Sequence, residues 1–460
     1  MWRLPRMAYP GTDVRASAAA APATASAPWG FAEIFVISQT ALPALLYLPG
    51  TQAIRFPIRV SAFAISLLAF GWWLLQPRVR TAPARAQAWL TAVLALVGLM
   101  IFHPGTASLV GGIAHVAVYA AVIVPVFWAP DCVRTPGQFA RVMWILLLCC
   151  GVNALVGVLQ VYDPNRFLPQ EFSHLYGDWS LGLGPVTFIG PNGQQMVRPP
   201  GLFDTPGAVA GPGMTAALLG LIFAVSASPL WQRVTAAALG CAGLAAIYLS
   251  QVRISLVLAV AMFTLYVVVL FRQRRVARGT QFATVAAAVV FGSFVLALTL
   301  GGESIQNRVE TLLADDPVSV YQQARGSQLS LAVNDLLYEY PAGAGLARWG
   351  MMAGYFGRND PNRPPLWAEI QLTGWLIDGG PLLVVLYLGA LGVTTLYQWR
   401  LTALTSRPRL AQCAAVAFCL EAGAAGLVLS FTPFVTQVGI QYWFLAGALH
   451  GVAFWSGVRE

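Results

Sequence analysis

Twelve apolar segments, each near the length of a membrane-spanning helix, constrain the fold of this chain more than any other feature. A helix needs about 20 mostly apolar residues to cross the hydrocarbon core of a bilayer. The segments lie near residues 29–49, 56–75, 87–103, 107–129, 139–161, 205–228, 231–250, 253–271, 281–300, 370–397, 409–430 and 433–456. We therefore expect an all-α polytopic membrane protein with about 12 transmembrane helices.

The composition fits a membrane protein and not a soluble one. Hydrophobic residues make up 57% of the chain and charged residues only 10%, whereas about 25% charged residues is typical of soluble domains. The net charge of +9 comes from arginines in short clusters between apolar segments. Such clusters are typical of cytoplasmic loops, and they argue against nucleic acid as a partner. The chain has no lysine, so the presence of arginine and not lysine at a given position is not informative. The positions of the arginines are informative.

Arginines concentrate in alternate connections, which predicts the orientation of the chain. Clusters precede the first segment and follow the second, fourth, eighth and tenth segments. The opposite short connections hold only Arg55, Arg59 and Arg253. Because positive charge accumulates in short cytoplasmic loops, we expect both termini to be cytoplasmic and two long segments, 162–204 and 301–369, to face outward.

These boundaries divide the chain into six parts. In order they are a disordered cytoplasmic tail (1–28), transmembrane helices 1–5 (29–161), an outer loop (162–204), transmembrane helices 6–9 (205–300), a large outer loop (301–369) and transmembrane helices 10–12 (370–460). The tail is rich in Ala, Pro and Ser but lacks the apolar core of a signal peptide. Pro191-Asn192-Gly193 indicates a hairpin in the first outer loop.

The large outer loop is expected to be partly helical. The pattern predicts a helix from Ser304 to Ala314, a break at Asp315-Asp316-Pro317, and a longer helix from Val318 to Tyr340 that ends before a Pro/Gly-rich stretch. Apolar residues recur at helical spacing in the longer helix, at Leu329, Val333, Leu336, Leu337 and Tyr340. We expect that face to pack against the rest of the protein.

Three arginines on the outer face are candidate ligands for a phosphate group. They are Arg198 before the sixth span, Arg253 at the start of the eighth span, and Arg325 on the longer loop helix. Guanidinium groups bind phosphate through two parallel hydrogen bonds. The alternative interpretations are solvated loop charges and, for Arg253, a side chain that reaches from the span to the lipid headgroups.

Glu369, where the large loop returns to the membrane, is the candidate catalytic base. A carboxylate there can accept a proton from a hydroxyl nucleophile, and the alternative is an interfacial residue paired with one of the arginines. Asp315 and Asp316 are interpreted as a helix break and not as a metal site. The six cysteines lie outside the long polar loops, so no disulfide framework or thiolate metal site is expected. No cofactor is expected.

Four segments together resemble the bacterial O-antigen ligase and polymerase superfamily. They are RPPGLFDTPG from Arg198, SQVR ending at Arg253, RGSQLSLAVNDLLYEYPAGAG from Arg325, and AEIQLTGWLIDGGPLL around Glu369. Their order and spacing, the number of spans and the large outer loop agree over most of the chain. The resemblance implies that Arg198 and Arg253 match arginines that hold the pyrophosphate of an undecaprenyl-linked glycan, and that Arg325 matches an arginine of the loop.

The chain departs from the superfamily where the loop returns to the membrane. Ligases carry a His-Asn pair there, and this chain has Glu369-Ile370. The resemblance therefore implies an O-antigen or exopolysaccharide polymerase more than a ligase that transfers glycan to lipid A-core. A carboxylate can do the same work as the histidine, because both accept a proton.

The resemblance also implies where the protein acts and with what. We expect a glycosyltransferase of the bacterial inner membrane that moves a glycan from undecaprenyl pyrophosphate to an acceptor sugar hydroxyl on the periplasmic face. Its partners would be the lipid-linked donor, the acceptor glycan, the lipid bilayer and other polysaccharide assembly proteins.

The alternative from another class is a lipid-linked oligosaccharide flippase or transporter. That class would show related halves and charged or broken helices near the bilayer midplane. The sequence instead has no internal repeat, and its charges gather at the outer face.

Overall fold

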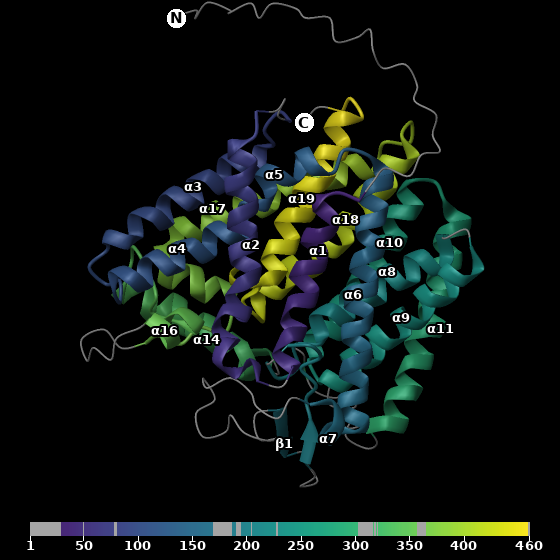
Figure 1. Ribbon diagram of the computed structural model, residues 1–460, viewed down its shortest axis with the longest axis horizontal. Coiled ribbons are helices and arrows are strands. Elements are labelled where there is room, and N and C mark those ends of the chain that lie inside the picture. The colour runs from purple at the N-terminus through teal and green to yellow at the C-terminus, as the bar shows by residue number, and fades with distance from the viewer. Residues whose placement is uncertain are drawn as a thin grey trace, which may run out of the picture.

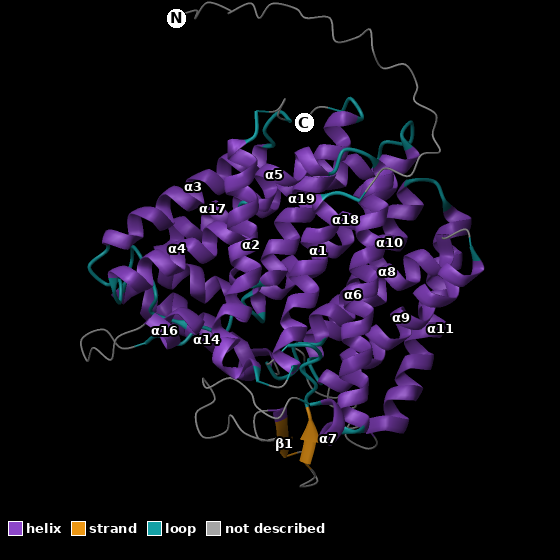
Figure 2. Cartoon of the chain, viewed as in Figure 1, coloured by secondary structure: helices purple, strands orange, loops and turns teal. Residues whose placement is uncertain are grey.

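The computed structural model describes most of the chain as helix. The described residues are 29–48, 50–77, 81–168, 186–189, 195–203, 205–226, 229–301, 316, 319, 321–356 and 365–458. Within them, helices pack side by side and one two-stranded sheet lies at one end of the bundle (Figure 2). The expected tail (1–28) and the expected helix from Ser304 to Ala314 lie outside the described residues.

The described helices and strands run in the following order. They are α1 (Phe31–Ala41), η2 (Leu42–Tyr47), η3 (Thr51–Ile54), α2 (Arg55–Leu75), α3 (Arg85–Leu99), η4 (Met100–Phe102), α4 (Leu109–Ile123), α5 (Pro125–Cys132), α6 (Pro136–Tyr162), α7 (Pro164–Phe167), β1 (Thr187–Ile189), β2 (Gln195–Val197), α8 (Ala210–Ser226), α9 (Leu230–Ser250), α10 (Arg253–Arg272), α11 (Val276–Gly301), η7 (Gln322–Gly326), α14 (Ser327–Leu331), η8 (Ala332–Leu336), α15 (Leu337–Glu339), α16 (Gly350–Phe356), α17 (Gln371–Thr402), α18 (Pro408–Gly426), η9 (Leu427–Leu429), η10 (Pro433–Val435) and α19 (Gln437–Trp455). Every expected span coincides with one or more of these helices.

Nine helices among the described residues are long and apolar enough to cross a membrane. The structure is therefore that of an all-α, multi-pass membrane protein. Three expected spans, 29–49, 205–228 and 433–456, correspond to helices that do not meet both criteria. The first is the shorter helix Phe31–Tyr47, the second is α8, and the third is α19. Almost all of α19 is buried, and polar residues of a membrane helix are tolerated where they face the interior of the bundle and not lipid.

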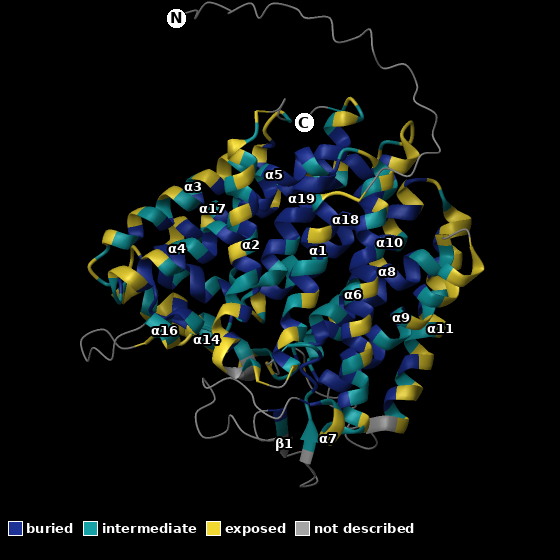
Figure 3. Cartoon of the chain, viewed as in Figure 1, coloured by how far each residue is buried: buried dark blue, intermediate teal, exposed yellow. Residues whose placement is uncertain are grey.

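Apolar side chains cover both the interior and the outer faces of the bundle. Buried residues fill the centre, and exposed residues lie on the surrounding faces (Figure 3). Several exposed side chains are large and apolar, among them Leu75, Leu99 and Phe291, which are 83%, 69% and 69% exposed. Such a surface would be unfavourable in water but suits contact with lipid.

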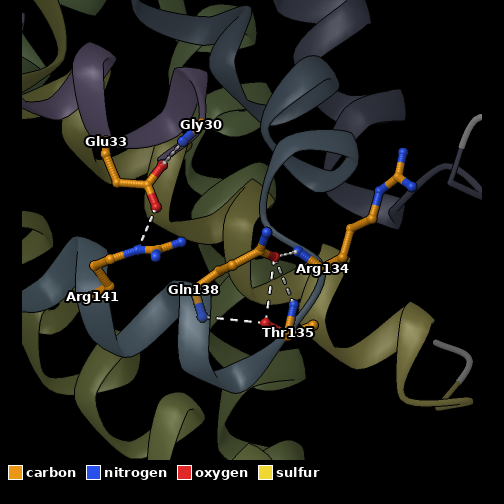
Figure 4. A network of polar contacts seen from close by, with 6 residues as sticks. All are labelled: Gly30, Glu33, Arg134, Thr135, Gln138 and Arg141. Carbon is orange, nitrogen blue, oxygen red and sulfur yellow. Dashed lines mark hydrogen bonds and ion pairs between the residues drawn. The ribbon is translucent and has the colours of Figure 1, made fainter. Parts of the chain in front are cut away.

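The start of α1, the start of α6 and the end of α19 lie at one end of the bundle. Arg141 of α6 donates from Nε to Glu33 Oε1 of α1 at 2.7 Å, and the Gly30 amide donates to Glu33 Oε2 at 3.0 Å (Figure 4). Arg134, next to the start of α6, lies 4.6 Å above the ring of Trp455. The first and last described helices thus begin and end on the side opposite β1 and α7 (Figure 1).

Close packing of α8 on α9 brings two segments together at the same end of the bundle. A Cβ atom on Gly220 of α8 would lie 2.6 Å from the Cα atom of Gly240 of α9, so the two backbones touch. Small residues permit this approach between membrane helices. The segment that leads into α8 is consequently held beside the end of α9.

The strands on either side of Pro191-Asn192-Gly193 pair as the sequence predicts. β1 and β2 are antiparallel, with Thr187 opposite Val197 and Ile189 opposite Gln195. The turn itself lies outside the described residues. The hairpin ends directly before Arg198.

Candidate functional site

The segment from Arg198 to Gly207 forms one wall of the candidate site. Its first residue continues from β2, and the Arg198 amide donates to the Val186 carbonyl at 2.7 Å. The Gly207 amide donates back to the Arg198 carbonyl at 3.3 Å. The segment is therefore a closed loop, and its backbone conformation sets the position of the Arg198 side chain.

Helix α6 anchors the middle of this loop. Gln160 accepts from the Gly201 amide at 2.9 Å and donates to the Gly201 carbonyl at 2.7 Å. Tyr47 also donates to that carbonyl, and Asn153 accepts from the Leu202 amide at 3.0 Å. Buried amide side chains hold the loop in one conformation because any other would leave their polar atoms unpaired.

The Arg198 guanidinium reaches the junction between α9 and α10. A Cβ atom on Gly207 would lie 3.3 Å from Arg198 Nη2 and 3.4 Å from the Ser250 carbonyl oxygen. At this junction Gln251 adopts a left-handed conformation, with φ of 58°, which ends α9 and allows Arg253 to begin α10. The structure thus places the loop that carries Arg198 against the turn that precedes Arg253.

Arg325 approaches the same place from the large loop. Burial lowers the pKa of Arg198, and electrostatic repulsion from Arg325 lowers it further. Burial also lowers the pKa of Arg325. Two guanidinium groups held near each other favour an anionic ligand, because the anion relieves their repulsion.

Glu369 forms an ion pair with Arg325. The pair joins Nη1 of the arginine to Oε2 of the carboxylate. Gln328, one turn after Arg325, accepts a hydrogen bond from the Glu369 amide at 3.2 Å. The arginine and carboxylate side chains are 39% and 29% exposed, so a ligand arriving from solvent can reach both.

The helix that carries Arg325, which we call the loop helix (321–339), docks through the face that contains Arg325. It consists of η7, α14, η8 and α15, with π-helical turns at η7 and η8. Gly326 and Ala332 are buried. Of the apolar residues expected to pack, Leu329, Leu336, Leu337 and Tyr340 are partly buried, but the prediction was wrong for Val333, which is 50% exposed. The π-helical turns alter the residue spacing, so a regular 3.6-residue repeat misplaces this residue.

A segment that follows the loop helix inserts into a break in α17. Helical geometry is interrupted at Gly379 and Gly380. The Ala344 amide donates to the Ile377 carbonyl at 2.7 Å. A Cβ atom on Gly380, whose φ is 65°, would lie 2.9 Å from the Ala342 carbonyl carbon. Only glycine fits this position, and residues 341–349, the inserted segment, fill the break.

Asp378, beside the break, is fully buried and accepts hydrogen bonds from two parts of the chain. Tyr119 of α4 donates to Oδ2 at 2.7 Å, and Trp349 of the inserted segment donates to Oδ1 at 2.9 Å. His115 Nδ1 accepts from the Ala347 amide at 3.0 Å, which places the proton on Nε2, 3.5 Å from Asp378 Oδ2. This cluster fastens the inserted segment between α4 and α17.

The sequence did not predict this cluster. His115 was not among the candidate residues, and α17 was expected to be one continuous span. The signal was Asp378-Gly379-Gly380-Pro381 within an apolar run, because a carboxylate in a membrane helix needs partners and Gly-Gly-Pro interrupts a helix.

The other acidic candidates do not form a metal site in the described part of the chain. Asp316 accepts from the Ser319 amide at 3.1 Å, as expected at a helix start, whereas Asp315 lies outside the described residues. Among the described residues no group of three His, Cys, Asp or Glu side chains converges on a point.

Comparison with known proteins adds no assignment. A scan against models of protein families found no match, and a search of curated proteins found no match. The candidate site consists of Arg198, Arg325 and Glu369, beside the turn that precedes Arg253.

Proposed function

We propose that this protein is a membrane glycosyltransferase that moves a glycan from a polyprenyl-pyrophosphate carrier to an acceptor sugar hydroxyl. The observation that carries the proposal is the ion pair between Arg325 and Glu369, with Arg198 near enough for the charge of Arg325 to lower its pKa further below the value that burial sets. Two cations and one carboxylate suit a reaction in which an anion leaves as a hydroxyl loses its proton. The resemblance of the surrounding motifs to O-antigen polymerases and ligases supports the same reaction.

In the proposed reaction the acceptor hydroxyl oxygen attacks the anomeric carbon of the donor glycan. The bond between that carbon and the pyrophosphate oxygen breaks, and polyprenyl pyrophosphate leaves with the electron pair. Arg198, Arg253 and Arg325 stabilise the negative charge of the leaving group, and Glu369 accepts the hydroxyl proton. Charge stabilisation of this kind is often the largest contribution to catalysis.

The proposal extends to topology and to the class of transferase. Twelve spans with both termini in the cytoplasm of a bacterium would put the site on the periplasmic face of the inner membrane, where lipid-linked glycans are joined. Carboxylate in place of the His-Asn pair of ligases favours a polymerase of exopolysaccharide or O-antigen. Transfer to lipid A-core by a ligase is the alternative within the same chemistry.

A transporter or flippase is the alternative from another class, and the break in α17 is the observation that favours it. Broken helices bind substrates near the midplane of many transporters. Here, however, the inserted segment occupies the break through the Ala344 amide and the Trp349 indole. A substrate would have to displace this part of the chain, and we therefore favour the enzyme.

The test is turnover by the purified, full-length protein in nanodiscs. Incubated with a polyprenyl-pyrophosphate oligosaccharide, it should lengthen the glycan and release polyprenyl pyrophosphate. Glu369→Gln keeps the size of the side chain but cannot take a proton, so the rate per folded molecule should fall about 10²–10⁴-fold. A rate within about threefold of wild type would exclude Glu369 as the base, and movement of an unchanged donor across vesicles would favour transport.

A further inference from the structure

The carboxylate proposed as the base is already engaged in the structure. Glu369 pairs with Arg325 through its side chain and with Gln328 through its backbone amide. Arg325 and Gln328 lie on the same face of the loop helix, since both contact Glu369. The loop helix therefore holds Glu369 at two points, and the arginine needed for phosphate is paired with the residue needed for the proton.

Arg198, in contrast to Arg325, forms no ion pair with a described residue. Its Nε atom is buried and has no hydrogen-bond partner among the described residues. It lies close enough to Arg325 for the two charges to repel. Among the described residues Glu369 neutralises Arg325, and no carboxylate there forms an ion pair with Arg198. A pyrophosphate carries charge on two linked phosphates, and each phosphate is a suitable ligand for a guanidinium group.

We propose that the Arg325–Glu369 ion pair is a latch that the donor opens, an inference that rests on the proposed function. Without the donor, Glu369 neutralises Arg325. When the pyrophosphate binds Arg198 and Arg325, the second guanidinium turns to the phosphate and releases the carboxylate. While the pair is closed, Arg325 occupies the carboxylate oxygen that would accept the proton. Release therefore frees Glu369 to act as a base only when a donor is in place.

If Glu369 is a latch, its substitution should change the affinity for the donor. If Glu369 acts only as a base, its substitution should change the rate and not the affinity. Glu369 competes with the phosphate for Arg325, so Glu369→Gln should bind a lipid pyrophosphate more tightly even though it turns over more slowly. Exposed ion pairs contribute up to about 1 kcal/mol, which corresponds to an affinity gain of about fivefold. Farnesyl pyrophosphate is a suitable soluble probe, titrated against the full-length protein in nanodiscs at fixed salt.

The matched control is Asp335→Asn, which removes the same charge from an exposed position on the loop helix. It should leave both affinity and turnover unchanged, and so it corrects for the general effect of net charge. If Glu369→Gln folds poorly, Glu369→Asp shortens the side chain by one methylene and weakens the pair. It should then bind the probe about twofold to threefold more tightly than wild type, on the same scale of ion-pair energies.

The outcomes separate the latch from the proposed function. Tighter binding in Glu369→Gln with slower turnover supports the latch. Equal affinity in Glu369→Gln, Asp335→Asn and wild type, with weaker binding in Arg198→Ala, overturns the latch and keeps the pyrophosphate site. Failure of the wild type to bind the probe, with no effect of Arg198→Ala, overturns the pyrophosphate site and the latch together.

Discussion

Substitution of Gly374 by alanine should displace the inserted segment and with it the candidate site. A Cβ atom on Gly374 would lie 2.4 Å from Cζ2 and 2.6 Å from Cη2 of Trp349, whereas ordinary contacts begin near 3.4 Å. The indole must therefore move by about 1 Å. Trp349 is only 4% exposed, and its Nε1 donates to Asp378 at 2.9 Å, so the ring has little room and a hydrogen bond to lose.

The expected cost combines two effects. Overpacking of a filled core typically costs about 1–3 kcal/mol, and a buried polar group that loses its hydrogen-bond partner costs about 1–3 kcal/mol. We expect Gly374→Ala to destabilise the protein by about 2–6 kcal/mol. With an unfolding entropy near 2.1 cal/mol/K per residue, this lowers the apparent Tm by about 2–6 °C. Differential scanning fluorimetry of the protein in nanodiscs at one scan rate measures the change.

Gly392 provides the matched control on the same helix. A Cβ atom at Gly392 has nothing within 4 Å, so Gly392→Ala should leave the Tm unchanged or raise it, since alanine favours helix. Gly374→Ala should also reduce glycan transfer per folded molecule, because the inserted segment supports the loop helix and Arg325. Equal Tm and equal turnover in the two variants would refute this account of the packing.

The remaining predictions concern charge and orientation. Arg198→Ala should weaken binding of a lipid pyrophosphate about 10- to 150-fold, the equivalent of one charged hydrogen bond, and Arg198→Lys should restore it poorly. Arg253→Ala should abolish polymer at normal protein levels, and wild-type polymer from that variant would leave Arg253 an anchor at the headgroups. Single cysteines at Ser173 and Ser327 should react with an impermeant maleimide in intact spheroplasts, and labelling only after lysis would reverse the proposed orientation.

Local patterns predicted most of the helices because the length of an apolar run limits what it can do in a bilayer. The turn signal at Pro191-Asn192-Gly193 similarly predicted paired strands, and β1 and β2 pair as expected. Pairing of Glu369 with an arginine was one of the sequence alternatives, and Arg325 is its partner. The catalytic role assigned to Glu369 stays a prediction.

Interactions between distant residues could not be read from such patterns. Tyr119 and Asp378 are 259 residues apart, and nothing near Asp378 in the sequence identifies its partners. The length of the apolar run around Gly380 predicted one continuous span, although Asp378-Gly379-Gly380-Pro381 is a local signal for the break. Val333 fits a regular helical repeat but is exposed, because π-helical turns change which residues share a face.

The insertion of residues 341–349 into α17 has a consequence for the order in which the protein assembles. The inserted segment is synthesised before α17, and α4, which supplies Tyr119, long before both. No nascent chain that ends before Asp378 can form the cluster of Tyr119, Trp349 and Asp378. The inserted segment can therefore dock only after Asp378 of α17 has been synthesised. The loop helix leads directly into the inserted segment, so it reaches its docked position late in biogenesis, after the residues of α1 to α11 have been synthesised.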